Sequence, residues 1–79
     1  MYYVYILQSS KDKKTYTGYT KNLNVRLSLH NGGRVLATKY RRPLELLLSE
    51  DFETLEEAKK RELWWKRSSG RKRLKKLFE

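Results

Sequence analysis

The amino-acid sequence predicts a small α+β domain: a three-stranded antiparallel sheet with flanking helices, in the order β-β-α-β-α-α. Two kinds of segment predict it, short apolar or alternating runs that suit strands and longer runs with helical spacing and capping residues. A chain of 79 residues can bury only roughly 60% of its unfolded surface, which leaves room for one thin core. We therefore expect one domain over residues 1–79 that ends in a basic helix.

The first predicted element is a strand over residues 2–7, a continuous run of β-branched and aromatic residues too short for a helix. Apolar side chains at consecutive positions need cover on both faces of a sheet, so this strand should be central. Residues 9–13 have turn composition and residues 15–19 alternate with a period of two, which predicts a hairpin. A turn centred on Ser10 and Lys11 would place Tyr5 opposite Tyr16.

A short helix and a third strand should follow. Asn22 is the expected N-cap of a helix over residues 23–30, and the glycine pair 32–33 should end it. The apolar run 44–48 predicts the third strand, with Pro43 where a strand can begin without losing a ladder donor.

The C-terminal third predicts two helices. Thr54 and Glu57 have capping-box spacing at the start of a helix that should run to residue 66 or 67. Residues 68–70 are expected to break it. The apolar side of the basic helix that follows is formed by Leu74, Leu77 and Phe78.

Charge indicates a polyanionic partner. The chain has 19 Lys and Arg against 9 Asp and Glu, a net charge of +10, and two basic blocks (residues 1–43 and 58–79) flank an acidic one (44–57). If the fold brings the basic blocks together, the field would favour a polyphosphate such as DNA. For the tail 71–76 alone, a solvated helical surface is an equal alternative.

Composition also excludes several classes. The absence of cysteine excludes a disulfide framework, a thiolate nucleophile and the usual zinc finger, and it fits a reducing cytoplasm. No segment approaches the roughly 18 apolar residues of a membrane span. We expect a cytoplasmic protein with no membrane contact and no organic cofactor.

Glu62 is an unusual residue of the first C-terminal helix. Its position continues an apolar stripe with helical spacing, formed by Leu55, Ala58 and Trp65. A carboxylate facing a core is costly unless it is paired, hydrogen-bonded or bound to a cation. Either Glu62 serves a cation, or it lies at the edge of the stripe and pairs with an arginine.

Two further groups could carry chemistry. Arg26 and His30 lie one helical turn apart and could reach one ligand together. A phenol, with a pKa near 10, can act as a base near neutrality only beside a cation or a partner that takes its proton. Gly18 lies in a strand, where glycine often marks a place at which another backbone or a ligand comes close. Four of the six tyrosines crowd the hairpin: Tyr2, Tyr3, Tyr5 and Tyr16.

These motifs together resemble the GIY-YIG nuclease domain, in the small stand-alone form of the UPF0213 type. The resemblance covers nearly the whole chain: Tyr3-Val4-Tyr5, then Tyr16-Thr17-Gly18, Arg26 and His30 on one helix, and Glu62 on a later one. It implies a three-stranded antiparallel sheet packed with helices, and Mg²⁺- or Mn²⁺-dependent cleavage of phosphodiester bonds in DNA.

The resemblance also implies roles. Tyr5 and Tyr16 would activate the attacking water and orient the phosphate, Arg26 would stabilise charge on the phosphate, and His30 would assist proton movement. Glu62 would be the sole protein ligand of the metal. Phosphates elsewhere on the nucleic acid would be met by Arg34, Lys39, Arg41, Arg42, Arg71, Lys72 and Arg73.

The chain departs from the family pattern at two points. Its first motif is Tyr-Val-Tyr instead of Gly-Ile-Tyr, which keeps the tyrosine, and no asparagine follows Asn31. The late asparagine of several family nucleases is therefore missing. The alternatives are a nucleic-acid-binding module that keeps the fold without catalysis, and a small basic protein bound to ribosomal RNA or to another protein.

Overall fold

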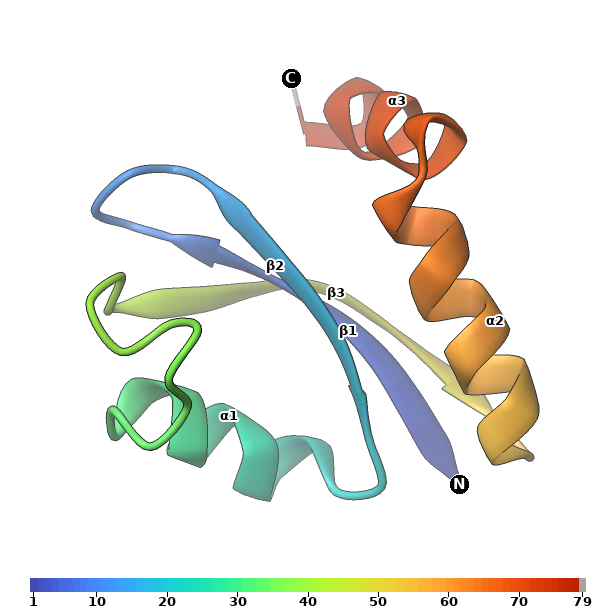
Figure 1. Cartoon of the computed structure of the whole chain (residues 1–79), viewed down its shortest axis with the longest axis horizontal. Coiled ribbons are helices and arrows are strands. Elements are labelled where there is room, and N and C mark those ends of the chain that lie inside the picture. Colours follow the sequence, from blue (N-terminus) through green and yellow to red (C-terminus); the bar gives the residue numbers. More distant parts are fainter. Residues whose placement is uncertain (79) are drawn as a thin grey trace.

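The computed structural model describes residues 1–78 and has the predicted fold class and element order (Figure 1). A three-stranded antiparallel sheet has the strand order β2-β1-β3, so the first strand is central as expected. No helix in residues 1–78 is long and apolar enough to cross a membrane. The elements are β1 (Tyr2–Ser9), β2 (Thr15–Thr20), α1 (Leu23–Asn31), β3 (Leu44–Phe52), α2 (Leu55–Lys66) and α3 (Ser68–Phe78).

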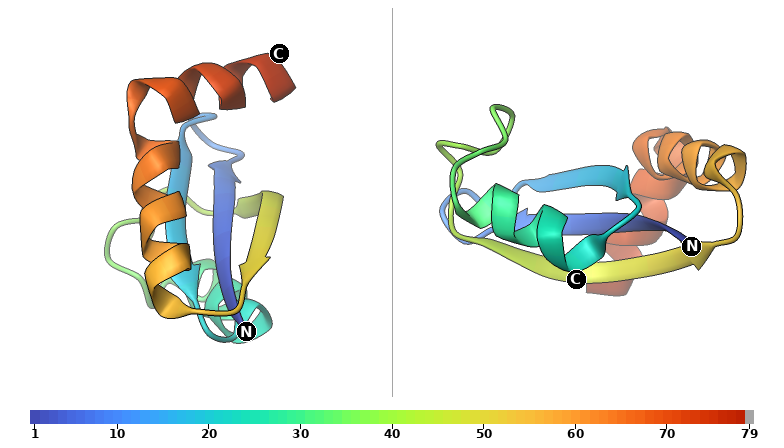
Figure 2. Two further views of the ribbon diagram at one scale, coloured as in Figure 1. Left: turned by 90° about the vertical axis from the view of Figure 1, so that its right-hand side faces the viewer. Right: turned by 90° about the horizontal axis from the view of Figure 1, so that it is seen from below.

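Helices cover both faces of the sheet, with α1 on one side and α2 and α3 on the other (Figures 1 and 2). Val4 and Ile6 of β1 pack against Ala58 and Trp65 of α2. The alternate side chains of β1 point the other way, where Tyr5 lies beside Leu27 of α1. One face therefore carries the larger apolar core, and the other carries the polar residues described below.

The hairpin register differs from the prediction by two residues. Tyr5 pairs with Gly18, and Tyr16 pairs with Leu7, so the expected Tyr5–Tyr16 pairing is wrong. The turn is centred on Lys11 and Asp12 instead of Ser10 and Lys11, and Lys13 within it adopts a left-handed φ of 63°. A shift of two keeps every side chain on its face, so Tyr5 and Tyr16 remain neighbours with ring centroids 6.4 Å apart.

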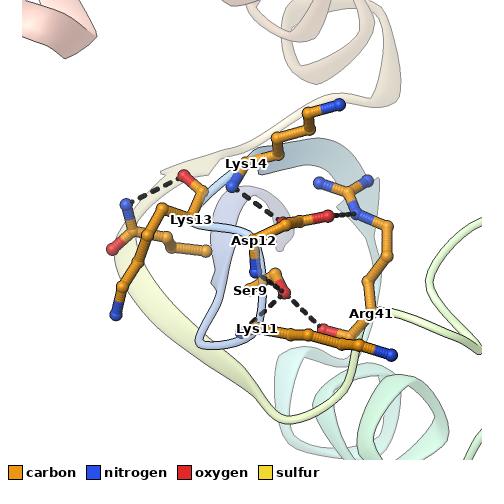
Figure 3. A network of polar contacts seen from close by, with 7 residues as sticks. Ser9, Lys11, Asp12, Lys13, Lys14 and Arg41 are labelled. Carbon is orange, nitrogen blue, oxygen red and sulfur yellow. Dashed lines mark hydrogen bonds and ion pairs between the residues drawn. The ribbon is translucent and has the colours of Figure 1, made fainter.

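A polar network joins the β1–β2 turn (residues 10–14) to the α1–β3 loop (residues 32–43), as Figure 3 shows. The buried Ser9 hydroxyl donates to the Arg41 carbonyl (2.6 Å) and accepts from the amides of Lys11 and Asp12. The Asp12 carboxylate accepts from the Lys14 amide and pairs with the Arg41 guanidinium at 3.3 Å. The network holds the loop against the end of the sheet.

The caps of α1 lie where the sequence predicts them, and β3 is longer than predicted. The Asn22 side chain accepts from the Val25 amide, and Gly32 caps the C-terminus. Asn31 then binds the backbone of Leu44 in both directions, donating to its carbonyl (3.1 Å) and accepting from its amide (2.8 Å). β3 runs to Phe52 instead of residue 48, because it pairs with β1 along its whole length.

Helix α2 is fixed to β3 by a partly buried ion pair between Arg61 and Glu50. The predicted capping box at its start is present. Arg61 donates to both oxygens of Glu50 (2.9 and 3.1 Å), and the indole of Trp65 donates to the same carboxylate at 2.7 Å. The Arg61 guanidinium also lies 4.1 Å from the ring centroid of Trp64. These contacts set the rotation of α2 and hence the direction of Glu62.

The predicted break at residues 68–70 is wrong, since α3 begins at Ser68 and the chain turns at the extended residue Arg67. Gly70 is buried in the first turn of α3 because a Cβ there would overlap the Trp64 carbonyl and the Trp65 backbone. Its role is therefore close helix packing. Of the predicted apolar side of α3, only Leu74 packs against the core, and Leu77 and Phe78 are 48% and 47% exposed.

Gly70→Ala should lower the free energy of unfolding by about 1–3 kcal/mol or more, because the added methyl group forces α2 and α3 apart. Urea denaturation measures the change. Ser69→Ala alters the exposed neighbour and should change stability by less than about 0.5 kcal/mol. Equal stabilities of the two variants would contradict this account of the α2–α3 junction.

Candidate active site

Tyr5 is buried at the centre of the face covered by α1. Its ring extends from β1 across Gly18 of β2, and a Cβ at Gly18 would stand 2.6 Å from the Tyr5 hydroxyl oxygen and 3.2 Å from the Tyr16 ring. Only glycine leaves room for the hydroxyl at this point. The group that approaches Gly18 is therefore a side chain, instead of the backbone or ligand considered from the sequence.

Both predicted residues of α1 reach the Tyr5 hydroxyl. His30 Nε2 lies 2.9 Å from it, and Arg26 donates through Nε at 3.3 Å. Because a guanidinium only donates, the Tyr5 oxygen accepts from Arg26, and its own proton can go to His30 Nε2 in the tautomer that leaves this nitrogen unprotonated. The single turn that separates Arg26 and His30 therefore brings them to one oxygen, that of Tyr5, while the shared ligand expected from the sequence stays a prediction.

Thr38 of the α1–β3 loop completes the chain of hydrogen bonds. Its hydroxyl lies 2.7 Å from His30 Nδ1, and both side chains are fully buried. The Thr38 hydroxyl donates to the Val35 carbonyl, so it accepts from His30 and assigns the ring proton to Nδ1. Nε2 is then an acceptor for Tyr5. Sequence reasoning missed Thr38, which no spacing signal distinguishes from the other threonines.

Tyr16 closes the cluster on the β2 side. Its ring is half-buried and packs edge-on against His30, with centroids 5.0 Å apart. We call Tyr5, Tyr16, Arg26, His30 and Thr38 the Tyr5 cluster. Four of these five were singled out from the sequence.

Burial keeps the cluster in one protonation state near neutral pH. Burial raises the pKa of the Tyr5 hydroxyl, the hydrogen bond from Arg26 opposes that effect, and the nearby Tyr16 and Glu62 raise it further. Burial and then the charge of Arg26 lower the pKa of His30. The resting state is therefore a neutral phenol hydrogen-bonded to a neutral imidazole.

Glu62 approaches from the opposite side of the sheet, on α2. Its side chain is only 14% exposed and pairs with Lys66 at 3.3 Å. The arginine partner considered from the sequence is wrong, because the adjacent Arg61 binds Glu50. The carboxylate lies close enough to Tyr5 for its charge to act on the phenol. Within residues 1–78 no three His, Cys, Asp or Glu side chains gather into a metal-binding group.

The predicted phosphate-binding residues fall into two regions. Arg34, Lys39 and Arg42 are exposed on the α1–β3 loop, whereas Arg41 is partly buried against Asp12. The other region is α3, where all three predicted basic side chains are exposed: Arg71, Lys72 and Arg73.

The β1–β2 turn links these two regions. Lys11 lines a small cavity with Lys39, Tyr40 and Arg42 of the loop. Lys13 and Lys14 line a larger cavity with residues of α3. The turn lysines were not predicted as site residues, and only the hairpin geometry places them between the two regions.

The GIY-YIG catalytic domain family matches the chain over residues 1–76. The chain belongs to the GIY-YIG family. It is 43% identical to a UPF0213 protein of Staphylococcus saprophyticus, over 99% of this chain and 95% of that protein. A UPF0213 protein of Lactococcus lactis is 46% identical, over 90% of this chain and 68% of that protein.

A solved relative agrees with the fold. The solution NMR structure of a UPF0213 protein from Bacillus halodurans is 34% identical and superimposes with a TM-score of 0.57, covering 99% of this chain and 86% of that one. Of the two tyrosines in the segment Tyr3-Val4-Tyr5 of this GIY-YIG domain, only Tyr5 belongs to the Tyr5 cluster. Tyr3 lines a separate cavity with Lys21 and Asn22.

The buried histidine of this GIY-YIG domain predicts a pH-dependent stability. Between the ordinary pKa of 6.5 and the lower pKa of folded His30, the unfolded chain binds more protons than the folded chain. The free energy of unfolding should therefore fall as pH is lowered from about 7.5 to 5.5, by up to about 1.4 kcal/mol per pH unit. Urea denaturation across this range measures the slope.

His30→Gln is the control, since it cannot titrate and should flatten the slope. Glu50 does not interfere: although burial opposes it, hydrogen bonds from Arg61 and Trp65 hold its pKa below the ordinary 4.5. A wild-type stability that is flat over this range, or an equal slope in the variant, would show that His30 is not buried in its neutral form.

Proposed function

We propose that this GIY-YIG domain is a divalent-metal-dependent nuclease that hydrolyses phosphodiester bonds in DNA. The observation that supports it most is the Tyr5 hydroxyl, held between a guanidinium and a neutral imidazole. Packing alone does not require such an arrangement, because phenylalanine would fill the same space without buried polar groups. The family description as a catalytic domain supports the same conclusion.

In this proposal Tyr5 and His30 move the proton of the attacking water. The Tyr5 oxygen accepts that proton while its own proton passes to His30 Nε2, along the hydrogen bond of 2.9 Å. The lowered pKa of His30 keeps Nε2 unprotonated at neutral pH, so that it can accept. Thr38 is a positioning residue, because it fixes the tautomer that leaves Nε2 available.

Arg26 and Tyr16 would contact the phosphate. Arg26 uses Nε on Tyr5 and is partly exposed, which leaves terminal N–H groups that can donate to phosphoryl oxygens. Tyr16 lies beside it, at the β2 edge, and would orient the same group. Charge on the phosphate would thus develop next to a fixed cation.

Glu62 fits the role of metal ligand. Mg²⁺ is usually held by one or two carboxylates, with waters and substrate phosphates completing its shell, so a lone carboxylate near the cluster is a suitable donor. When bound, Mg²⁺ or Mn²⁺ would polarise a phosphoryl oxygen. Without a cation, Glu62 would repel the phosphate that Arg26 attracts.

We extend the proposal to the partner and its location. A net charge of +10 favours a polyphosphate, and the lack of cysteine fits the cytoplasm. The side chains proposed to meet DNA phosphates are Arg34, Lys39, Arg42, Arg71, Lys72 and Arg73, with Arg41 acting through the loop that it anchors.

A second candidate is a nucleic-acid-binding module without catalysis. The Glu62–Lys66 ion pair favours it, since a carboxylate already neutralised within its own helix needs no metal. The nuclease requires the Glu62 carboxylate for metal-dependent cleavage, whereas the binding module does not require it.

Glu62→Gln keeps the shape and removes the charge. Metal-dependent cleavage of labelled DNA should fall on the order of 10²-fold or more. DNA binding in EDTA should be retained, and stability should change by less than about 1 kcal/mol, because Lys66 is half-exposed. Glu56→Gln, an exposed carboxylate of the same helix, is the control. Unfolding of Glu62→Gln without metal would instead support a structural ion pair.

Tyr5→Phe removes one oxygen from the centre of the cluster. Cleavage should fall on the order of 10²-fold, as expected when a positioned acid-base group is lost. Tyr16→Phe should behave similarly, and the double variant should lose much less than the product of the two losses. Tyr3→Phe shares the strand face and is the control. Cleavage rates under single-turnover conditions decide: equal losses in Tyr3→Phe and Tyr5→Phe would contradict the assignment.

A further inference from the structure

We propose that a groove between α3 and the β1–β2 turn binds one unpaired strand of the nucleic acid, next to the bond that is cleaved. The proposal rests on the proposed function, because it names the form of the substrate. Two adjoining cavities of about 470 and 320 Å³ make up the groove. They share Thr15, Arg71 and Leu74, so they are continuous.

The groove lies on the face of the sheet covered by α2 and α3, and its inner end meets the β2 edge, beyond which lies the Tyr5 cluster. α3 lies across the end of the sheet that carries the β1–β2 turn (Figure 2, left). The smaller cavity is lined by residues 15–17 of the edge strand β2 and by Lys66, the partner of Glu62. The ring of Tyr16, by contrast, packs on His30 on the other face. The larger cavity extends to Phe78 near the end of α3. A strand that leaves the groove over the β2 edge would thus reach the cluster.

Its rims are basic and come from both sides. Lys13 and Lys14 of the turn line one side, and Arg71 of α3 lines both cavities from the other. The backbone of the turn is fixed, since Gln8 donates to the Lys13 carbonyl (3.1 Å) and Asp12 accepts from the Lys14 amide (2.9 Å). Cations on opposite sides of a groove suit a phosphate backbone that runs between them.

The floor is apolar, and this decides the form of the occupant. Leu47 of β3 and Leu74 of α3 line the cavity, and Phe78 remains about half-exposed there. A duplex presents phosphates and base edges, because its base faces are stacked inside. An unpaired strand presents base faces, which stack on aromatic side chains in basic grooves. The combination of basic rims and an apolar floor that ends in a half-exposed phenylalanine therefore favours a single strand.

Fluorescence anisotropy with the full chain in EDTA tests the proposal, using a labelled oligothymidine of about 12 nucleotides and a duplex of equal length. The single strand should bind more tightly. Phe78→Ala should weaken its binding roughly 5-fold to 100-fold, the loss expected for one stacked base, and leave duplex binding unchanged. Leu77→Ala, a neighbour of equal exposure outside the groove, is the matched control and should bind like the wild type.

A second pair of variants tests the rim. Arg71→Gln and Arg73→Gln remove the same charge from the same helix, but only Arg71 lines the groove. Arg71→Gln should weaken single-strand binding more. Several results would contradict the proposed single-strand groove. They are equal losses of single-strand affinity in Arg71→Gln and Arg73→Gln, tighter binding of the duplex than of the single strand, or a Phe78→Ala variant with wild-type single-strand affinity. Displacement of the labelled strand by polyaspartate as effectively as by unlabelled oligothymidine would also contradict it.

These experiments distinguish a failure of the groove proposal from a failure of the proposed nuclease function. Single-strand binding that depends on Phe78 without metal-dependent cleavage would support the groove and overturn the nuclease. Cleavage that depends on Glu62, with binding indifferent to Phe78 and Arg71, would do the opposite.

Discussion

Burial of β1 on both faces is the constraint on which the rest of the structure depends. Val4, Tyr5, Ile6 and Leu7 are consecutive and almost completely buried. Full burial of such side chains contributes about 1.5–3 kcal/mol each, a large share of what a chain of this size can gain. Because alternate side chains point to opposite faces, the strand that fixes α2 through Ile6 also presents Tyr5 to α1. The core and the Tyr5 cluster therefore share one strand.

Much of this arrangement follows from local sequence patterns. The continuous apolar run placed β1 at the centre, and Asn22 and the Thr54–Glu57 box set the starts of two helices. These features depend on residues within one turn or strand. The same locality brings Arg26 and His30 to one side of α1, and the fold then supplies the hydroxyl that they share.

What failed depends on contacts between distant residues. The turn with its left-handed Lys13 is centred one residue later than predicted, and glycine or asparagine, the usual signal for that conformation, is absent there. Gly70 was interpreted as a helix breaker, whereas its role is visible only when Trp65 lies against it. Glu50 binds Arg61 from another element, and Thr38 reaches His30 only because the loop folds back. Hydrophobic periodicity along the sequence cannot predict such contacts between distant residues.

The α1–β3 loop is closed at its base, where the Asn31 side chain binds both backbone groups of Leu44. Loop closure entropy grows slowly with length, by about 0.6 kcal/mol for each doubling, so a closed base can carry loops of different length at little cost. Only Thr38 ties the interior of this loop to the cluster through a buried side chain. The exposed side chains of Lys39, Tyr40 and Arg42, which flank the anchored Arg41, can thus be exchanged in evolution, changing what the surface recognises while the fold and the tautomer of His30 are kept.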